Sequence, residues 1–117
     1  MNRSGLIVDT LRSAGIDARL PGAHDGVCTS PYAVVRQMSG VVSGGGGRIS
    51  YSVILLVPQD SPELLDGFAE SVRQAMSPLA GHGIELSSPR GAVLTDDYFR
   101  AVTTYTDYIS YFSQSTE

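Results

Sequence analysis

The clearest pattern along the chain is an alternation of apolar residues between positions 48 and 57. Every second residue from Ile49 to Val57 is apolar, which is the period of a β-strand with one buried face. The other face begins polar at Ser50 and becomes apolar from Ile54 onward. We therefore expect a strand whose second half is covered on both sides, by helices or by a neighbouring subunit.

The first residues show helical spacing instead. An apolar stripe runs through residues 4 to 14, and Gly15 follows it as a stop signal. The members of the stripe are Leu6, Ile7, Thr10, Leu11 and Ala14. This pattern predicts an amphipathic helix that packs on a sheet.

A second helix is predicted from about residue 62 to residue 77, with a broad apolar stripe from Leu64 to Leu79. Asp60 or Ser61 is placed to cap its first turn, which contains Pro62. Pro78 and Gly81 are expected to end it.

The remaining segments favour strands and connections. Residues 32–38 predict a strand opened by Pro31, and residues 98–112 predict a long strand rich in aromatic and β-branched residues. Residues 15–31 read as a connection with at most one short strand, and residues 82–97 as irregular with a short strand at 84–86. The order helix, strand, strand, helix, strand predicts one α+β domain over residues 1–117. Its mostly antiparallel sheet has about four strands, with two helices packed on it.

Four consecutive glycines, Gly44 to Gly47, precede the alternating strand. Glycine loses the most backbone entropy on ordering, so we expect a flexible hairpin tip. A phosphate-binding loop is not favoured, because no Lys follows the glycines and a strand follows where such a loop leads into a helix.

Composition narrows the function classes. Twelve acidic and eight basic residues give a net charge of -4, and all eight basic residues are arginines. They are scattered along the chain without a basic run, which argues against sequence-specific nucleic-acid binding. The lone cysteine, Cys28, excludes an internal disulfide, and the N-terminal apolar run is too short for a signal peptide. We expect a chain made in the cytoplasm, with no membrane partner.

Few residues offer catalytic or metal-binding chemistry. His24 and Cys28 place an imidazole and a thiol close together, but residues so near in one loop rarely reach each other productively. With His82 they fall short of the four ligands of a zinc site. Asp96 and Asp97 are adjacent, so in a strand they point to opposite faces. We therefore expect no enzyme activity, no metal and no cofactor.

The tyrosines are more informative. Four of the six fall in the predicted last strand, and tyrosine is enriched at protein interfaces because it joins a large apolar body to a hydroxyl. The alternative is a sheet face covered by the chain's own helices. Together with an arginine beside the glycine run, they form the candidate interface with other subunits or a protein partner: Tyr98, Tyr105, Tyr108, Tyr111 and Arg48.

The order of elements resembles the tail terminator proteins of long-tailed bacteriophages, also called tail completion or minor tail proteins. The resemblance rests on the N-terminal helix ending at residues 11–15, the strand opener at 31–35, the strand ending at Val57, the helix from 64 to 79 and the segment 96–105 leading into the last strand. It covers nearly the whole chain and contains no unique motif. The four-glycine run has no counterpart in the family pattern.

The resemblance implies a homo-oligomeric ring, typically of six copies, in the virion at the head-proximal end of the tail. Such a ring ends polymerisation of the tail tube protein and presents a surface to the head-tail connector proteins. No catalytic residue is implied. The alternatives are a head-tail connector or neck protein, a small-molecule binding α/β module, and an enzyme that uses His24 and Cys28.

Overall fold

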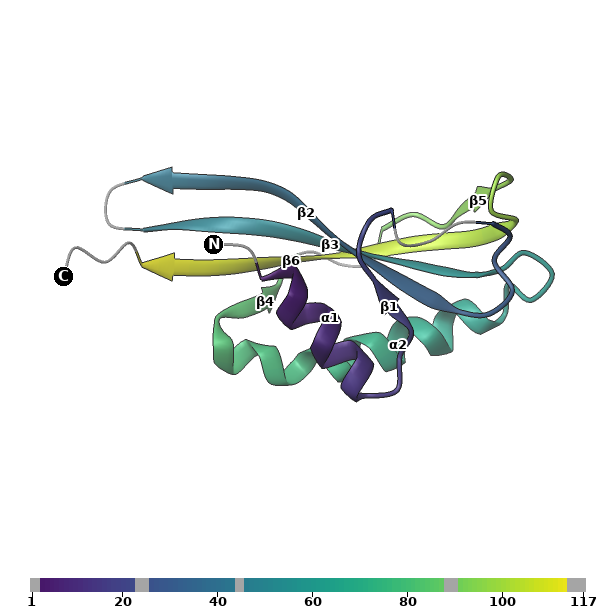
Figure 1. The fold of residues 1–117 in the computed structure, drawn as a ribbon, viewed down its shortest axis with the longest axis horizontal. Helices are drawn as coiled ribbons and strands as arrows, with labels where there is room; N and C mark the ends of the chain where they lie inside the picture. Colours follow the sequence, from purple (N-terminus) through teal and green to yellow (C-terminus); the bar gives the residue numbers. More distant parts are fainter. Residues whose placement is uncertain (1–2, 23–25, 44–45, 88–90, 114–117) are drawn as a thin grey trace.

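One six-stranded sheet forms the centre of the molecule (Figure 1). The computed structural model describes residues 3–22, 26–43, 46–87 and 91–113. Along the sheet the order is β1-β2-β3-β6-β4, and β5 also pairs with β6. Among the described strands, only β1 and β2 pair in parallel. The strands are β1 (Ala18–Arg19), β2 (Tyr32–Ser43), β3 (Gly46–Pro58), β4 (Ile84–Leu86), β5 (Leu94–Asp96) and β6 (Ala101–Ser113).

The α+β class and the mostly antiparallel sheet are confirmed, but the expectation of about four strands is wrong. The two-residue β1 and the three-residue β4 and β5 lie at the margins of the sheet. Strands this short are too brief to show a period of two, and backbone pairing with a long neighbour defines them instead. The sequence predicted a short strand at residues 84–86 and at most one within 15–31, and it missed β5.

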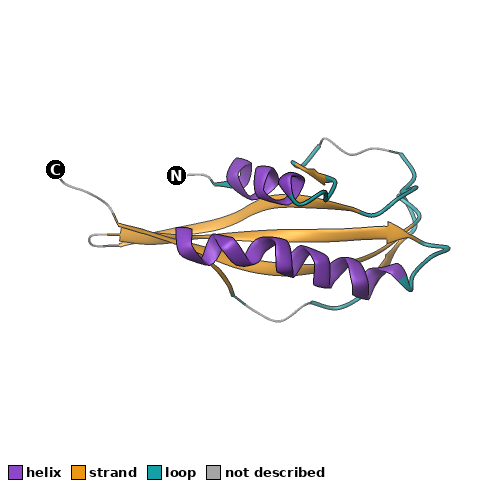
Figure 2. Cartoon of the chain, turned by 90° about the horizontal axis from the view of Figure 1, so that it is seen from below, coloured by secondary structure: helices purple, strands orange, loops and turns teal. Residues whose placement is uncertain are grey.

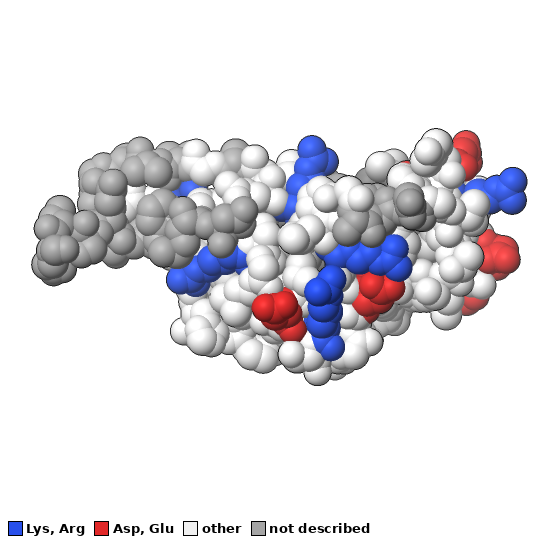
Figure 3. Space-filling view, in the orientation of Figure 1, with Lys and Arg blue, Asp and Glu red and all other residues white. Residues whose placement is uncertain are grey.

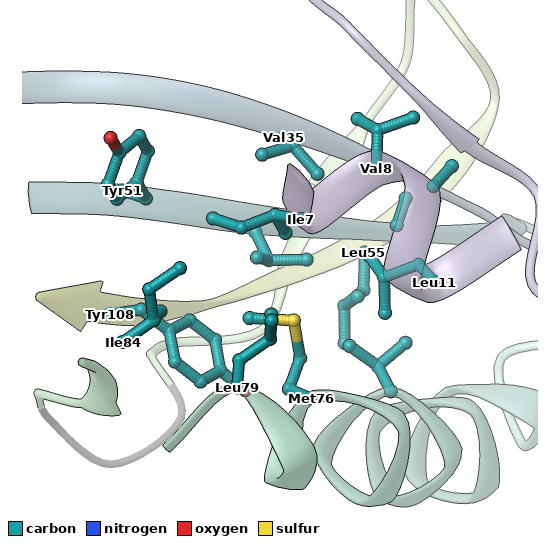
Figure 4. Close-up of a cluster of buried hydrophobic side chains, with 14 of the residues drawn as sticks. Ile7, Val8, Leu11, Val35, Tyr51, Leu55, Met76, Leu79, Ile84 and Tyr108 are labelled. Carbon is teal, nitrogen blue, oxygen red and sulfur yellow. The ribbon is translucent and has the colours of Figure 1, made fainter. Parts of the chain in front are cut away.

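All of the described helices lie on one face of this sheet (Figures 1 and 2). They are α1 (Ser4–Ser13), α2 (Leu64–Met76) and the 3₁₀-helix η1 (Ser77–His82). Alternate residues of β3, from Ile49 to Val57, are all at most 7% exposed and point toward the helices, as the alternation predicted. Figure 4 shows Ile7 and Leu11 of α1 meeting Leu55 of β3 in this core.

The buried face of α1 is rotated from the predicted stripe. Leu6 is 38% exposed, whereas Val8 is buried beside Ile7 and Leu11. The reason is that α1 contacts both the sheet and α2, so its buried side lies between the two partners. The Thr10 hydroxyl, also assigned to the stripe, donates instead to the Leu6 carbonyl on the exposed side.

Helix α2 begins at Leu64, later than predicted, and ends at Met76, next to the predicted end at residue 77. Its N-cap is Glu63, and no side chain caps the first turn. Neither Asp60 nor Ser61 caps the helix, because residues 58–61 form a backbone turn in which the Ser61 amide donates to the Pro58 carbonyl. At the other end the helix tightens into η1, which terminates at Gly83 with a φ of 80°.

The last strand also starts later than predicted. Strand β6 begins at Ala101, and residues 97–100 form a turn in which Arg100 has a φ of 50°. The Asp96 carboxylate accepts a hydrogen bond from the Phe99 amide at 3.1 Å and holds that turn. As predicted, β2 and β3 are antiparallel neighbours. Gly44 and Gly45 of the predicted flexible tip lie outside the described residues, and Gly46 and Gly47 belong to β3.

The molecule is elongated, with principal extents of 53 × 24 × 24 Å. At one end β2, β3 and β6 continue beyond the helices (Figure 1). A bulge interrupts β2 there, since Gln37 pairs with Tyr51 whereas Gly40 pairs with Ile49. Two residues of β2 thus oppose Ser50 alone, which bends the strand and increases its twist.

Candidate interaction surface

The face of the sheet turned away from the helices is covered at one end only. There, the segment that contains Cys28 and the ring of Phe99 pack over Tyr32, Val34 and Leu56 in a second, smaller apolar cluster. Beyond that cluster none of the described helices covers this side of the sheet (Figure 1). We call the uncovered region the open face. The strand registers assign to it Arg36, Arg48, Ser50, Ser52, Glu85, Tyr105, Asp107, Ile109 and Tyr111, with Ile54 at its border, where it packs against the apolar cluster.

Arg48 and Tyr111 lie directly opposite each other on the open face. They are register partners in the β3–β6 pair, and cross-strand partners have Cβ atoms about 5 Å apart. Both side chains are exposed, and Tyr111 is 53% exposed. Two of the residues predicted from the sequence for an interface therefore form one contiguous surface.

Tyr105 lies on the same face of β6 as Tyr111, and Asp107 and Ile109 lie between them on that face. Tyr105 pairs with Ile54 of β3 and is 39% exposed. Gly91 packs against its ring, and the Gly91 amide donates to the Tyr105 carbonyl at 2.8 Å. This contact supports one side of the ring and leaves the rest accessible.

The other two candidate tyrosines are not part of the open face. Tyr108 points to the helix side, is 4% exposed and belongs to the main core (Figure 4). Its hydroxyl has no hydrogen-bond partner within the described part of the chain, and burial raises its pKa to about 12. Tyr98 lies in the turn before β6, 82% exposed, with its ring edge-on to Phe99 at 4.9 Å between centroids.

Three charged residues of the open face, Arg36, Glu85 and Asp107, were not singled out by sequence reasoning. Arg36 and Asp107 both pair with Ser52, from opposite sides of β3. The described ranges contain two ion pairs, Arg19 with Asp17 and Arg73 with Glu70, and neither involves the open face. In Figure 3, basic and acidic side chains are interspersed over the visible side. The alternation along each strand predicts that Arg36 and Asp107 point away from the core. The strand register is needed to show that they lie side by side across Ser52.

The positions considered for catalysis are separated or buried. The Cys28 thiol is 4% exposed, donates to the Ser30 carbonyl at 3.3 Å, and has a pKa raised by burial. His24 lies outside the described residues. Asp96 holds the turn before β6, and within the described ranges no group of three His, Cys, Asp or Glu residues is placed to bind a metal ion.

A small cavity of about 250 Å³ lies between η1 and β4, lined by apolar side chains that include Met76, Ile84 and Leu86. A larger, open depression of about 710 Å³ lies at the opposite end of the sheet, between the Cys28 segment and the start of α2. Neither brings together a set of convergent charged groups that identifies a small ligand.

No known protein family model matches the chain, and no curated protein matches it significantly. Among the helices that the structure describes, none is both long and apolar enough to cross a membrane.

Proposed function

We propose that this chain is a non-catalytic structural protein that acts by assembling with other copies of itself and with other proteins. In its specific form, the proposal is a tail terminator of a long-tailed bacteriophage. Several copies, typically six, would form a ring in the virion at the head-proximal end of the tail tube. The ring would end polymerisation of the tube protein and join the tail to the head-tail connector proteins.

The observation that carries the proposal is the open face. A regular sheet surface exposes Tyr105, Tyr111 and Arg48 where none of the described helices covers it. Tyr and Arg are the residue types enriched in protein interfaces, and they contribute most when water is excluded around them. A surface of this composition favours a protein partner over a small substrate.

A ring also needs a heterologous contact whose rotation closes. The part of β2, β3 and β6 that extends beyond the helices presents the open face on one side and strand edges at its margin (Figure 1). The open face and the strand edges differ from the helix side of the molecule. One subunit could therefore contact its neighbour through two unlike surfaces, as a ring requires. A head-tail connector or neck protein would use the same kind of contacts, and the choice between the two lies in the partner.

The test is to mix the purified chain with the tail tube protein encoded beside it and to examine the product by negative-stain electron microscopy, with its mass measured in parallel. Rings, or tubes of fixed length capped at one end, are the expected products. Tyr111→Ala should reduce capping, whereas Tyr98→Ala, an exposed tyrosine away from the open face, is the matched control. A wild-type chain that leaves tube growth unchanged would exclude the terminator role, and binding to portal-side proteins alone would favour the connector.

A further inference from the structure

The open face is divided into a basic half and an acidic half. Its two arginines, Arg36 and Arg48, lie on β2 and β3. Its acidic residues lie on the neighbouring strands, with Asp107 on β6 and Glu85 on β4. Glu85 takes the open face because the preceding residue, Ile84, is buried in the core on the helix side.

These charges are not neutralised within the described part of the chain. Neither ion pair of the described residues includes any of the four. Arg36 and Asp107 flank Ser52 on either side, so their backbones are two strand spacings apart, about 10 Å. The two opposite charges thus face the same direction without meeting.

Apolar and aromatic side chains lie beside the charges on β3 and β6, and Ser52 lies between Arg36 and Asp107. Tyr105 pairs with Ile54, Ile109 pairs with Ser50, and Tyr111 pairs with Arg48. The open face therefore combines apolar and aromatic side chains with basic residues on one half and acidic residues on the other. A phosphate-bearing or uniformly charged partner would meet repulsion over one half, whereas a partner with the same mosaic in reverse order would match both halves.

We propose that a second copy of this chain supplies that partner, through a face-to-face contact between two open faces. A two-fold axis that runs along the strands between β3 and β6 exchanges these two strands between the copies. Arg48 then lies over Tyr111 of the second copy, a cation–π arrangement, and Tyr105 lies over Ile54 of the second copy. Arg36 lies one strand spacing, about 5 Å, to the side of Asp107 of the second copy, within reach of the long arginine side chain.

This contact is isologous and closed, so it stops at two copies. Two sheets packed in this way keep their strands nearly aligned, as in a β-sandwich. The pair goes beyond the proposed ring and does not depend on it: it describes the free protein, in which the open face is covered before any assembly partner competes for it.

The test is sedimentation velocity of the purified full chain at micromolar concentrations, which should give a dimer. Arg36→Asp and Asp107→Arg each place like charges together at both symmetry-related contacts, so each should weaken dimerisation at least tenfold. An equimolar mixture of the two variants should restore the dimer, because both contacts then join opposite charges. Asp9→Arg on the exposed side of α1 is the matched control and should dimerise normally, with circular dichroism confirming the fold of every variant.

A monomeric wild-type chain at these concentrations would overturn the inference, and so would single variants that lose the dimer without recovery on mixing. The ring proposal is judged separately by tube capping. Capping by a chain that is monomeric when free would overturn the face-to-face pair and leave the terminator role standing. A dimer that obeys the charge exchange but leaves tube growth unchanged would support the pair and exclude the terminator role.

Discussion

Gly91 lies against the ring of Tyr105 so closely that no other residue fits there unchanged. A Cβ atom added to Gly91 would stand 2.3 Å from two ring atoms of Tyr105. The backbones are joined as well, because the Gly91 amide donates to the Tyr105 carbonyl and the Thr104 hydroxyl donates to the Gly91 carbonyl at 2.9 Å. An aromatic ring that covers a neighbouring glycine shields its backbone and fixes its own orientation. The glycine thus positions a tyrosine of the open face.

We predict that Gly91→Ala lowers the free energy of unfolding by about 1 to 3 kcal/mol, because the new methyl group displaces the ring. In a Tyr105→Ala background the same change should stabilise the protein by about 0.5 kcal/mol, because Gly91 has no positive φ and alanine lowers the entropy of the unfolded chain. Urea unfolding of the wild type, both single variants and the double variant measures this coupling.

Gly67→Ala is the control for these glycine substitutions. Gly67 lies inside α2 with nothing within 4 Å of its added Cβ, so alanine there should stabilise by about 1 kcal/mol in either background. If Gly91→Ala lowers the free energy of unfolding equally with and without the Tyr105 ring, the clash with the ring is not the cause of the loss.

We predict that Tyr108 makes the stability of the protein fall at alkaline pH. Burial raises the pKa of its hydroxyl to about 12 from 10.0. The folded state favours the neutral tyrosine. The stability that this preference gives the folded protein is fully present below pH 10 and is lost as the pH rises toward 12. The loss amounts to about 3 kcal/mol of unfolding free energy. Denaturant unfolding at a series of pH values measures it.

Tyr108→Phe is the matched variant for this effect. It keeps the ring in the core and removes a hydroxyl that has no partner among the described residues, so it should raise the stability at neutral pH by about 1 kcal/mol. It should also remove most of the alkaline loss. Superimposable pH profiles for the variant and the wild type would assign the loss to other groups.

The sequence predicted the long helices and strands because each buries one face against a large core, which spaces its apolar residues periodically. The alternation at residues 48–57 gave β3 and its buried face correctly, and the stripe at 64–79 gave α2. The short strands β1 and β5 were harder to predict, because they exist through backbone pairing with β2 and β6. Such pairing leaves little trace in side-chain pattern.

The candidate surface was predicted only in part, for a related reason. Tyrosines at 105 and 111 fall on one face and the tyrosine at 108 on the other, since strand residues alternate. The sequence alone does not say which of the two faces the helices cover, and Tyr108 proved to be on the covered one. Arg48 joins the surface through its register with Tyr111, which depends on the whole length of the β3–β6 pairing.

We predict that Cys28 reacts slowly with thiol reagents. Its sulfur is buried and its pKa is raised by that burial, so the reactive thiolate is scarce and poorly accessible. At pH 8 a chromogenic disulfide reagent should modify it at least tenfold more slowly than free cysteine, and unfolding in urea should restore the full rate. Rapid modification of the folded protein at pH 7 would instead indicate an activated thiol and would favour an enzyme that uses His24 and Cys28.

We predict that Tyr111→Ala weakens assembly while leaving the fold intact. Tyr111 is 53% exposed, so its removal should change the free energy of unfolding by less than about 0.5 kcal/mol. At the centre of an interface a tyrosine contributes about 2 kcal/mol, which corresponds to a roughly thirtyfold weaker contact. Arg48→Ala should have a similar effect, because its side chain stands opposite Tyr111. Mass measurements over a range of concentrations compare Tyr111→Ala and Arg48→Ala with the control Tyr98→Ala. If the three variants assemble equally well, the open face is not an interface.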